Sequence, residues 1–155
     1  MKNLDTYLND HLAGSVAALE LIEHWRDRYK HQPLGNFFET LKAEIDADRQ
    51  KLCEVMHSLG VDESTIRQTG AWAAEKLARA RMKIAGDEVG LVLALEGLIM
   101  GILGKRMMWR SLAAINLPDA SNWGFEELLR RAENQIERTE VERLRAVQRA
   151  FDGTG

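Results

Sequence analysis

Cysteine, proline and histidine are all scarce in this chain of 155 residues, and each scarcity excludes a class of structure or site. The single cysteine, Cys53, can form neither an internal disulfide nor a cysteine-based zinc site, and it suits a reducing compartment, so we expect a cytoplasmic protein. The two prolines, Pro33 and Pro118, leave long stretches in which helices can run uninterrupted. Histidine occurs only at positions 11, 24, 31 and 57, so none lies in the second half of the chain.

Long apolar runs and a charge of one sign are also missing. The longest apolar run extends from Val89 to Leu103 and has Glu96 in its middle. As a helix it would span about 22 Å, less than the roughly 30 Å hydrocarbon core of a bilayer. The first residues carry acidic and polar groups where a signal peptide needs an apolar segment. A net charge of -3 gives no reason to expect nucleic acid as a partner. We therefore expect no export, no membrane partner and no nucleic-acid partner.

Helical periodicity is what the sequence has throughout. Apolar residues recur at helical spacing between punctuated polar stretches, and no segment alternates as a strand does. We predict an all-α single domain over residues 1–155, with core helices at about 4–30, 37–59, 88–115 and 123–151. A further helix at about 64–85 is long enough to carry the chain from one end of the bundle to the other. This pattern favours an up-down-down-up four-helix bundle with a crossover helix, and a five-helix up-down bundle is the alternative.

Two predicted helices carry further signals. The helix at 37–59 is expected to begin after Asn36 and to end at Gly60. The helix at 88–115 is apolar nearly all round and contains a seam of small residues at heptad spacing: Gly90, Ala94, Gly97, Gly101 and Gly104. Glycine costs about 1 kcal/mol relative to alanine in a helix interior, so the seam indicates a close approach or space for a large side chain. The sequence leaves open whether the seam packs within the chain or against a second copy in a homodimer.

Three stretches of the sequence carry a family resemblance: YLNDHLAGSVAALELIEH near the start, AWAAEKL in the middle and LALEGLIMGILGK later. Together they resemble a bacterial branch of the ferritin-like superfamily that has no assigned activity. The resemblance implies a four-helix bundle over nearly the whole chain. For active relatives it also implies a di-iron or di-manganese site, built from a Glu on each of two helices and a Glu-x-x-His on each of the other two.

The sequence departs from that metal-binding pattern. Its only Glu-x-x-His runs from Glu54 to His57, and the second half has no histidine to supply another. On a helical wheel both residues lie opposite the apolar stripe of their helix, which comprises Leu41, Ile45, Asp48, Leu52, Val55 and Leu59. We therefore expect Glu54 and His57 to be solvated and the di-metal motif to be incomplete.

Other polar residues are predicted to point inward. His11, Asp48, Glu96 and Lys105 lie on apolar stripes, and Glu20 lies on a different side of its helix. The leading interpretation is a buried ion-pair and hydrogen-bond network that fixes helix register in a non-catalytic bundle without a cofactor. The alternative is an Fe or Mn site formed by Glu20, Asp48, Glu96 and His11, in a metal-dependent redox or metal-binding protein. A third hypothesis is a small-molecule pocket beside the seam, lined by Trp25, Trp72 and Trp109.

The last predicted helix is rich in arginine but interleaves it with glutamate. Pairs such as Glu126 with Arg130 and Glu127 with Arg131 stand four residues apart. We expect these pairs to form a solvated face rather than a patch for nucleic acid.

Overall fold

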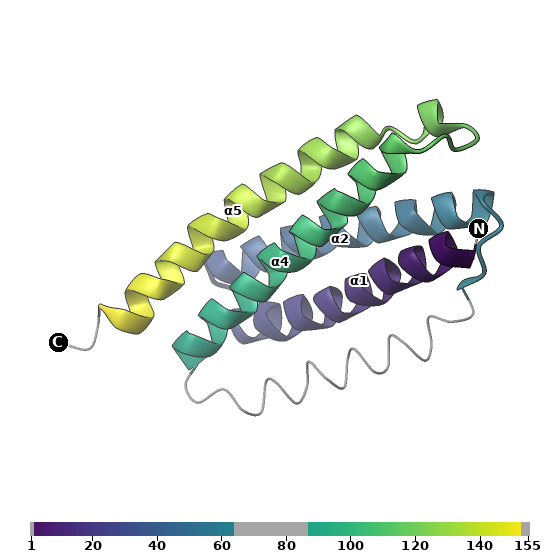
Figure 1. Cartoon of the computed structure of the whole chain (residues 1–155). Helices are drawn as coiled ribbons and strands as arrows, with labels where there is room; N and C mark the ends of the chain where they lie inside the picture. Colours follow the sequence, from purple (N-terminus) through teal and green to yellow (C-terminus); the bar gives the residue numbers. More distant parts are fainter. Residues whose placement is uncertain (1, 64–86, 153–155) are drawn as a thin grey trace.

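Four long α-helices make up most of the chain (Figure 1). The computed structural model describes residues 2–63 and 87–152, and no strand occurs within them. The helices are α1 (Lys2–Arg28), α2 (Pro33–Ser58), α4 (Asp87–Ala114) and α5 (Phe125–Phe151), with a short 3-10 helix, η2 (Ala120–Asn122), between the last two. The predicted all-helical fold is confirmed. The predicted helix at 64–85 and Trp72 lie outside the described residues.

The helices form two hairpins that lie against each other (Figure 1). A short turn joins α1 to α2, and Arg26 near the end of α1 pairs with Glu39 near the start of α2, 3.3 Å apart. Between the hairpins, the start of α1 lies beside the end of α4, where Tyr7 Oη donates to Ser111 Oγ at 3.4 Å. Helices α1 and α2 therefore run antiparallel, and so do α1 and α4.

Helix α2 begins at Pro33, four residues earlier than predicted. Proline suits the first helical position because the amide hydrogen it lacks would have no partner there. Asn36, the predicted cap, lies inside the helix and donates its amide hydrogen to the carbonyl of Gln32 at 3.1 Å. The buried Gly35 packs against the backbone of Tyr29, so closely that any added Cβ would overlap the Tyr29 carbonyl. Close packing of the turn therefore accompanies the start of α2 at Pro33.

The end of α2 lies where the sequence predicts it. Gly60 has a φ of 68°, the left-handed conformation that glycine adopts without strain. The amide of Val61 donates to the carbonyl of Met56 at 2.9 Å, and the amide of Gly60 donates to that of His57 at 3.1 Å. These bonds satisfy carbonyl groups that the last turn would otherwise leave unpaired.

The core consists of two apolar clusters. One surrounds Trp25, Phe38 and Leu95, and the other surrounds Met56, Trp109 and Phe125. Along α2 the clusters are separated at Asp48, because Ile45 belongs to the first and Leu52 to the second. Along α4 the division falls at Lys105, and along α5 it falls at Arg131, between Leu129 and Ala132. The bundle therefore has a polar layer between two apolar halves, and this layer consists of Asp48, Lys105, Arg131 and Gln135.

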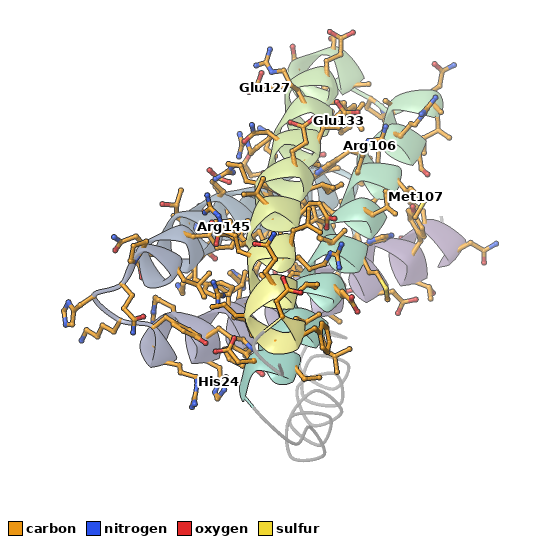
Figure 2. The ribbon with its side chains drawn as sticks, turned by 90° about the vertical axis from the view of Figure 1, so that its left-hand side faces the viewer. His24, Arg106, Met107, Glu127, Glu133 and Arg145 are labelled. Carbon is orange, nitrogen blue, oxygen red and sulfur yellow. The ribbon has the colours of Figure 1, made fainter. Side chains whose placement is uncertain are left out.

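The outer face of α4 carries exposed apolar side chains. Among the described residues, the large hydrophobic residues that are exposed lie on α4 and α5 or directly after α4: Val89, Leu93, Met100, Leu103, Met107, Ile115, Val141, Leu144 and Phe151. In Figure 2, Met107 projects from α4 on the side away from α5, whereas Arg106 and Glu133 face each other between the two helices. Among the described residues, no helix is both long enough and apolar enough to cross a membrane.

The predicted seam of small residues divides into several environments. Gly90 and Ala94 are buried, so that part packs within the chain. At Gly104 an added Cβ would lie 3.9 Å from the ring of His11. Gly97 and Gly101 are exposed, and an added Cβ would meet nothing within 4 Å at either position. The described residues therefore account for the packing of only part of the seam.

Candidate functional site

Asp48 is the centre of the polar layer. Its side chain is only 1% exposed, and α4 and α5 supply every hydrogen bond that it accepts. One carboxylate oxygen, Oδ1, accepts a hydrogen bond from Arg131 Nη1 at 2.8 Å. The other, Oδ2, accepts from Lys105 Nζ at 2.5 Å and from Gln135 Nε2 at 3.1 Å. Both oxygens are thus occupied by donors, two of which are cationic.

Lys105 closes the layer into a triangle. Besides its bond to Asp48, its Nζ donates to Gln135 Oε1 at 2.5 Å. Its side chain is 16% exposed, and burial lowers the pKa of the ammonium group, opposed by the nearby Asp48 carboxylate. Because Gln135 both donates to Asp48 and accepts from Lys105, the three side chains hold one another in a fixed orientation.

A second ion pair extends the layer toward the surface. Arg138 Nη2 donates to Glu44 Oε2 at 2.5 Å, one turn along α5 and one turn back along α2 from the Asp48 contacts. Both side chains are about a third exposed, as is that of Arg131. The exposure of the charged side chains therefore increases from the buried Asp48 to the partly exposed guanidinium groups on α5.

Two of the predicted inward polar residues lie in the polar layer, and one does not. Asp48 is buried, and the partly buried Lys105 donates a hydrogen bond to it. The prediction that Glu96 points into the core is wrong, because its side chain is 43% exposed and lies 3.5 Å from Arg143 of α5. The neighbours of Glu96 along α4 are apolar, but its cationic partner lies on α5. A prediction made from one helix at a time does not include such a partner.

The remaining predicted residues lie apart from Asp48. His11 is half-buried and its ring meets the edge of Tyr7, with ring centroids 4.7 Å apart. Glu20 is half-buried on α1, and the hydrogen bonds to Asp48 come from α4 and α5 instead. Glu54 and His57 are exposed as predicted, and Glu54 pairs with Lys51 at 2.9 Å.

These side chains do not fit the di-metal centre that the family resemblance implies. Within residues 2–63 and 87–152, no group of three or more His, Cys, Asp or Glu side chains is placed to hold a metal ion. Asp48, the one buried carboxylate within the described parts of the chain, presents both oxygens to cationic and amide donors. A metal ion would have to displace Lys105 and Arg131 and would then meet their positive charges.

Two residues of the layer were missed by the sequence argument. Arg131 and Gln135 come from α5, whose alternating charges predict a solvated face. Gln135 nevertheless shares the buried face formed by Leu128, Ala132, Gln135, Thr139 and Ala146, and that spacing is visible in the sequence. The predicted pair of Glu127 with Arg131 is wrong, because Glu127 pairs with Arg130 and Arg131 turns inward to Asp48.

A cavity of about 210 Å³ lies beside the layer, between α1, α2 and α4. Its walls include Asp48 and Lys105, the ring of Trp109, and small residues of α1 and α4. Trp109 is fully buried, and its indole N–H has no hydrogen-bond partner among the described residues. His11 also lines the cavity, and burial lowers the pKa of its imidazole, with a smaller opposing effect from Asp10.

Comparison with models of known protein families, with curated proteins and with solved structures finds no match. The geometry of the polar layer and of the cavity is therefore the basis for a function.

Proposed function

We propose that this chain is a non-catalytic, ferritin-like helical bundle in which a buried ion network stands where active relatives hold two metal ions. The helix lengths and the antiparallel packing of neighbouring helices support the up-down-down-up arrangement. A cytoplasmic location and the absence of a nucleic-acid partner belong to the same proposal. The leading role of the network is structural: it sets the register of α2, α4 and α5.

The observation that carries this proposal is the saturation of Asp48. Burying a carboxylate without partners destabilises the folded state, and removing one partner of a buried ion pair typically costs about 3–5 kcal/mol. A buried carboxylate therefore restricts the packing of its neighbours to arrangements that supply its partners. Asp48 satisfies this restriction only when Lys105 and Gln135 arrive at the same level. Sliding α4 by one turn would break both hydrogen bonds of Lys105, and sliding α5 would break those that Arg131 and Gln135 make to Asp48.

Metal loading tests the proposal against its alternative, a metal-binding or metal-dependent redox protein. The purified chain would be incubated with Fe(II) under anaerobic conditions, or with Mn(II), then desalted and analysed for bound metal. We expect the metal content to stay far below one equivalent per chain and to be unchanged in the Asp48→Asn variant. Stoichiometric metal that is lost in Asp48→Asn would overturn the proposal.

The exposed apolar face supports self-association as a second property. We propose that the outer faces of α4 and α5 pack against a second copy of the chain. Large apolar residues gather there and on no other described helix, and Met100 is 70% exposed near the middle of α4. On α5, the exposed Glu137 and Arg145 stand four residues on either side of Val141. Two antiparallel copies of α5 that cross at Val141 would therefore place opposite charges together twice, which favours a second copy as the partner.

A further inference from the structure

The cavity between α1, α2 and α4 exists because small residues line it on two helices. Gly14 of α1 and Gly101 of α4 line the cavity and are exposed, so they lie at its open side, and a Cβ added at either would meet nothing within 4 Å. Gly104 completes this lining on α4. Each glycine costs about 1 kcal/mol relative to alanine in a helix interior, and no described side chain fills the space. The volume of about 210 Å³ exceeds that of an engineered cavity of about 150 Å³ that accepts benzene.

Most of the cavity wall is apolar. Ile45 and Leu52 of α2 contribute on one side, and Ile102, Met108 and Trp109 of α4 on the other. All five are buried. A wall of this kind suits a ring or a branched hydrocarbon body and gains free energy when that body leaves water.

Two buried donors of the wall have no partner. The indole N–H of the fully buried Trp109 and the Nε–H of Arg49 lack hydrogen-bond partners among the described residues. A buried donor without an acceptor costs about 1–3 kcal/mol. A ligand with an oxygen acceptor would remove this cost, and a wholly apolar ligand would not.

The charged groups that line the cavity balance, because Asp10 and Asp48 oppose Arg49 and Lys105. Asp48 is already paired with Lys105 and Arg131, so the group that favours an anionic acceptor is Arg49. Arg49 adds a guanidinium whose contact with Asp46 is long, at 3.5 Å. Of the other ionisable groups that line the cavity, His11 is half-buried and Asp10 is exposed at the rim.

We propose that this cavity binds a small organic carboxylate whose apolar body is about the size of a six-membered ring. The ring lies against Ile102, Met108 and Trp109, and the carboxylate accepts hydrogen bonds from Trp109 Nε1 and Arg49 Nε. Asp48 lines this cavity, but its oxygens are occupied by Lys105, Arg131 and Gln135, so the proposed binding does not use it and does not depend on whether the layer is purely structural.

Benzoate is the probe that tests this proposal, with benzyl alcohol and benzylamine as neutral and cationic controls of similar shape. Each would be titrated into the full chain and followed by two-dimensional NMR, with the Trp109 indole N–H resonance identified from a Trp109→Phe variant. We expect benzoate to shift that resonance saturably, benzyl alcohol to bind about fivefold more weakly, and benzylamine to bind least. No saturable shift with benzoate, or stronger binding of benzylamine, would overturn the proposal.

A filled cavity provides the matched control. Both glycines are exposed on α4, but Gly101 lines the cavity and Gly97 does not, so Gly101→Leu adds a side chain at the cavity and Gly97→Leu adds the same side chain away from it. Circular dichroism would establish that both variants fold. We expect Gly101→Leu to abolish benzoate binding and Gly97→Leu to keep it. Binding that survives Gly101→Leu would overturn the proposed location, and if that variant does not fold, the shift of the Trp109 resonance in the unaltered chain decides the question.

Discussion

At the scale of single residues, Asp48 and Glu96 illustrate how neighbouring helices decide the role of a carboxylate. Asp48 is 1% exposed and receives donors from α4 and α5, so it can act only as a fixed anion. Glu96 is 43% exposed and meets Arg143 at 3.5 Å, so water screens much of the attraction. Both lie among apolar residues of their own helices, and their different environments result from how the helices pack.

His11 gives a prediction of pH dependence at this scale. Burial disfavours the charged imidazolium and places the pKa of His11 below the ordinary value of 6.5. Between those two values the unfolded chain binds more protons than the folded chain, so the folded state loses stability as pH falls through this range. We expect the free energy of unfolding to fall less on acidification in a His11→Asn variant than in the unaltered chain.

The same variant identifies the His11 signal in an NMR titration. We expect this signal in the unaltered chain to have its midpoint below pH 6.5. A midpoint above that value would show that the Asp10 charge outweighs burial, and the acid-induced loss of stability would then change sign.

At the scale of elements, the sequence predicts the existence of the four described helices correctly, and turn packing sets their boundaries. Gly60 ends α2 as predicted because its left-handed conformation is a local property of the chain. The start of α2 at Pro33 was missed because it depends on the contact between Gly35 and the backbone of Tyr29. Such a contact joins residues on either side of a turn. Helix propensities, which describe each segment separately, do not include it.

Two glycine substitutions test this account of the helices with opposite signs. Gly35→Ala forces a Cβ into the Tyr29 carbonyl, and we expect it to lower the free energy of unfolding by about 1–3 kcal/mol. Gly14→Ala adds the same atom to α1 where nothing lies within 4 Å, and we expect a gain of up to about 1 kcal/mol. Chemical denaturation of both variants without added ligand provides the measurement. A loss at Gly14 as large as that at Gly35 would contradict the proposed tight turn.

At the scale of the whole molecule, the polar layer links three helices at one level of the bundle. Its α2 and α4 members were predictable, because Asp48 and Lys105 interrupt apolar stripes in the sequence. Its α5 members, Arg131 and Gln135, were not identified because the charges of that helix resemble those of a solvated face. The sequence also could not predict the distances of Glu20, Glu96 and His11 from Asp48, since these depend on how the helices pack.

Self-association is also a property of the whole molecule. We expect sedimentation velocity to show a dimer for the unaltered chain and a monomer for Met100→Glu, because the new charge would be buried against the second copy. His57→Glu, an exposed substitution on α2, is the control and should leave the dimer intact. A monomeric unaltered chain at the same concentration would contradict the proposed interface.

The coupling free energy between Asp48 and Lys105 tests the central claim most directly. It would be measured by a double-mutant cycle with Asp48→Asn and Lys105→Met, beside a reference cycle with Glu96→Gln and Arg143→Met. We predict a coupling of about 2 kcal/mol or more for the buried pair and a clearly smaller one for the partly exposed reference pair. Equal coupling in the two cycles would contradict the account of Asp48 as the fixed centre of the bundle.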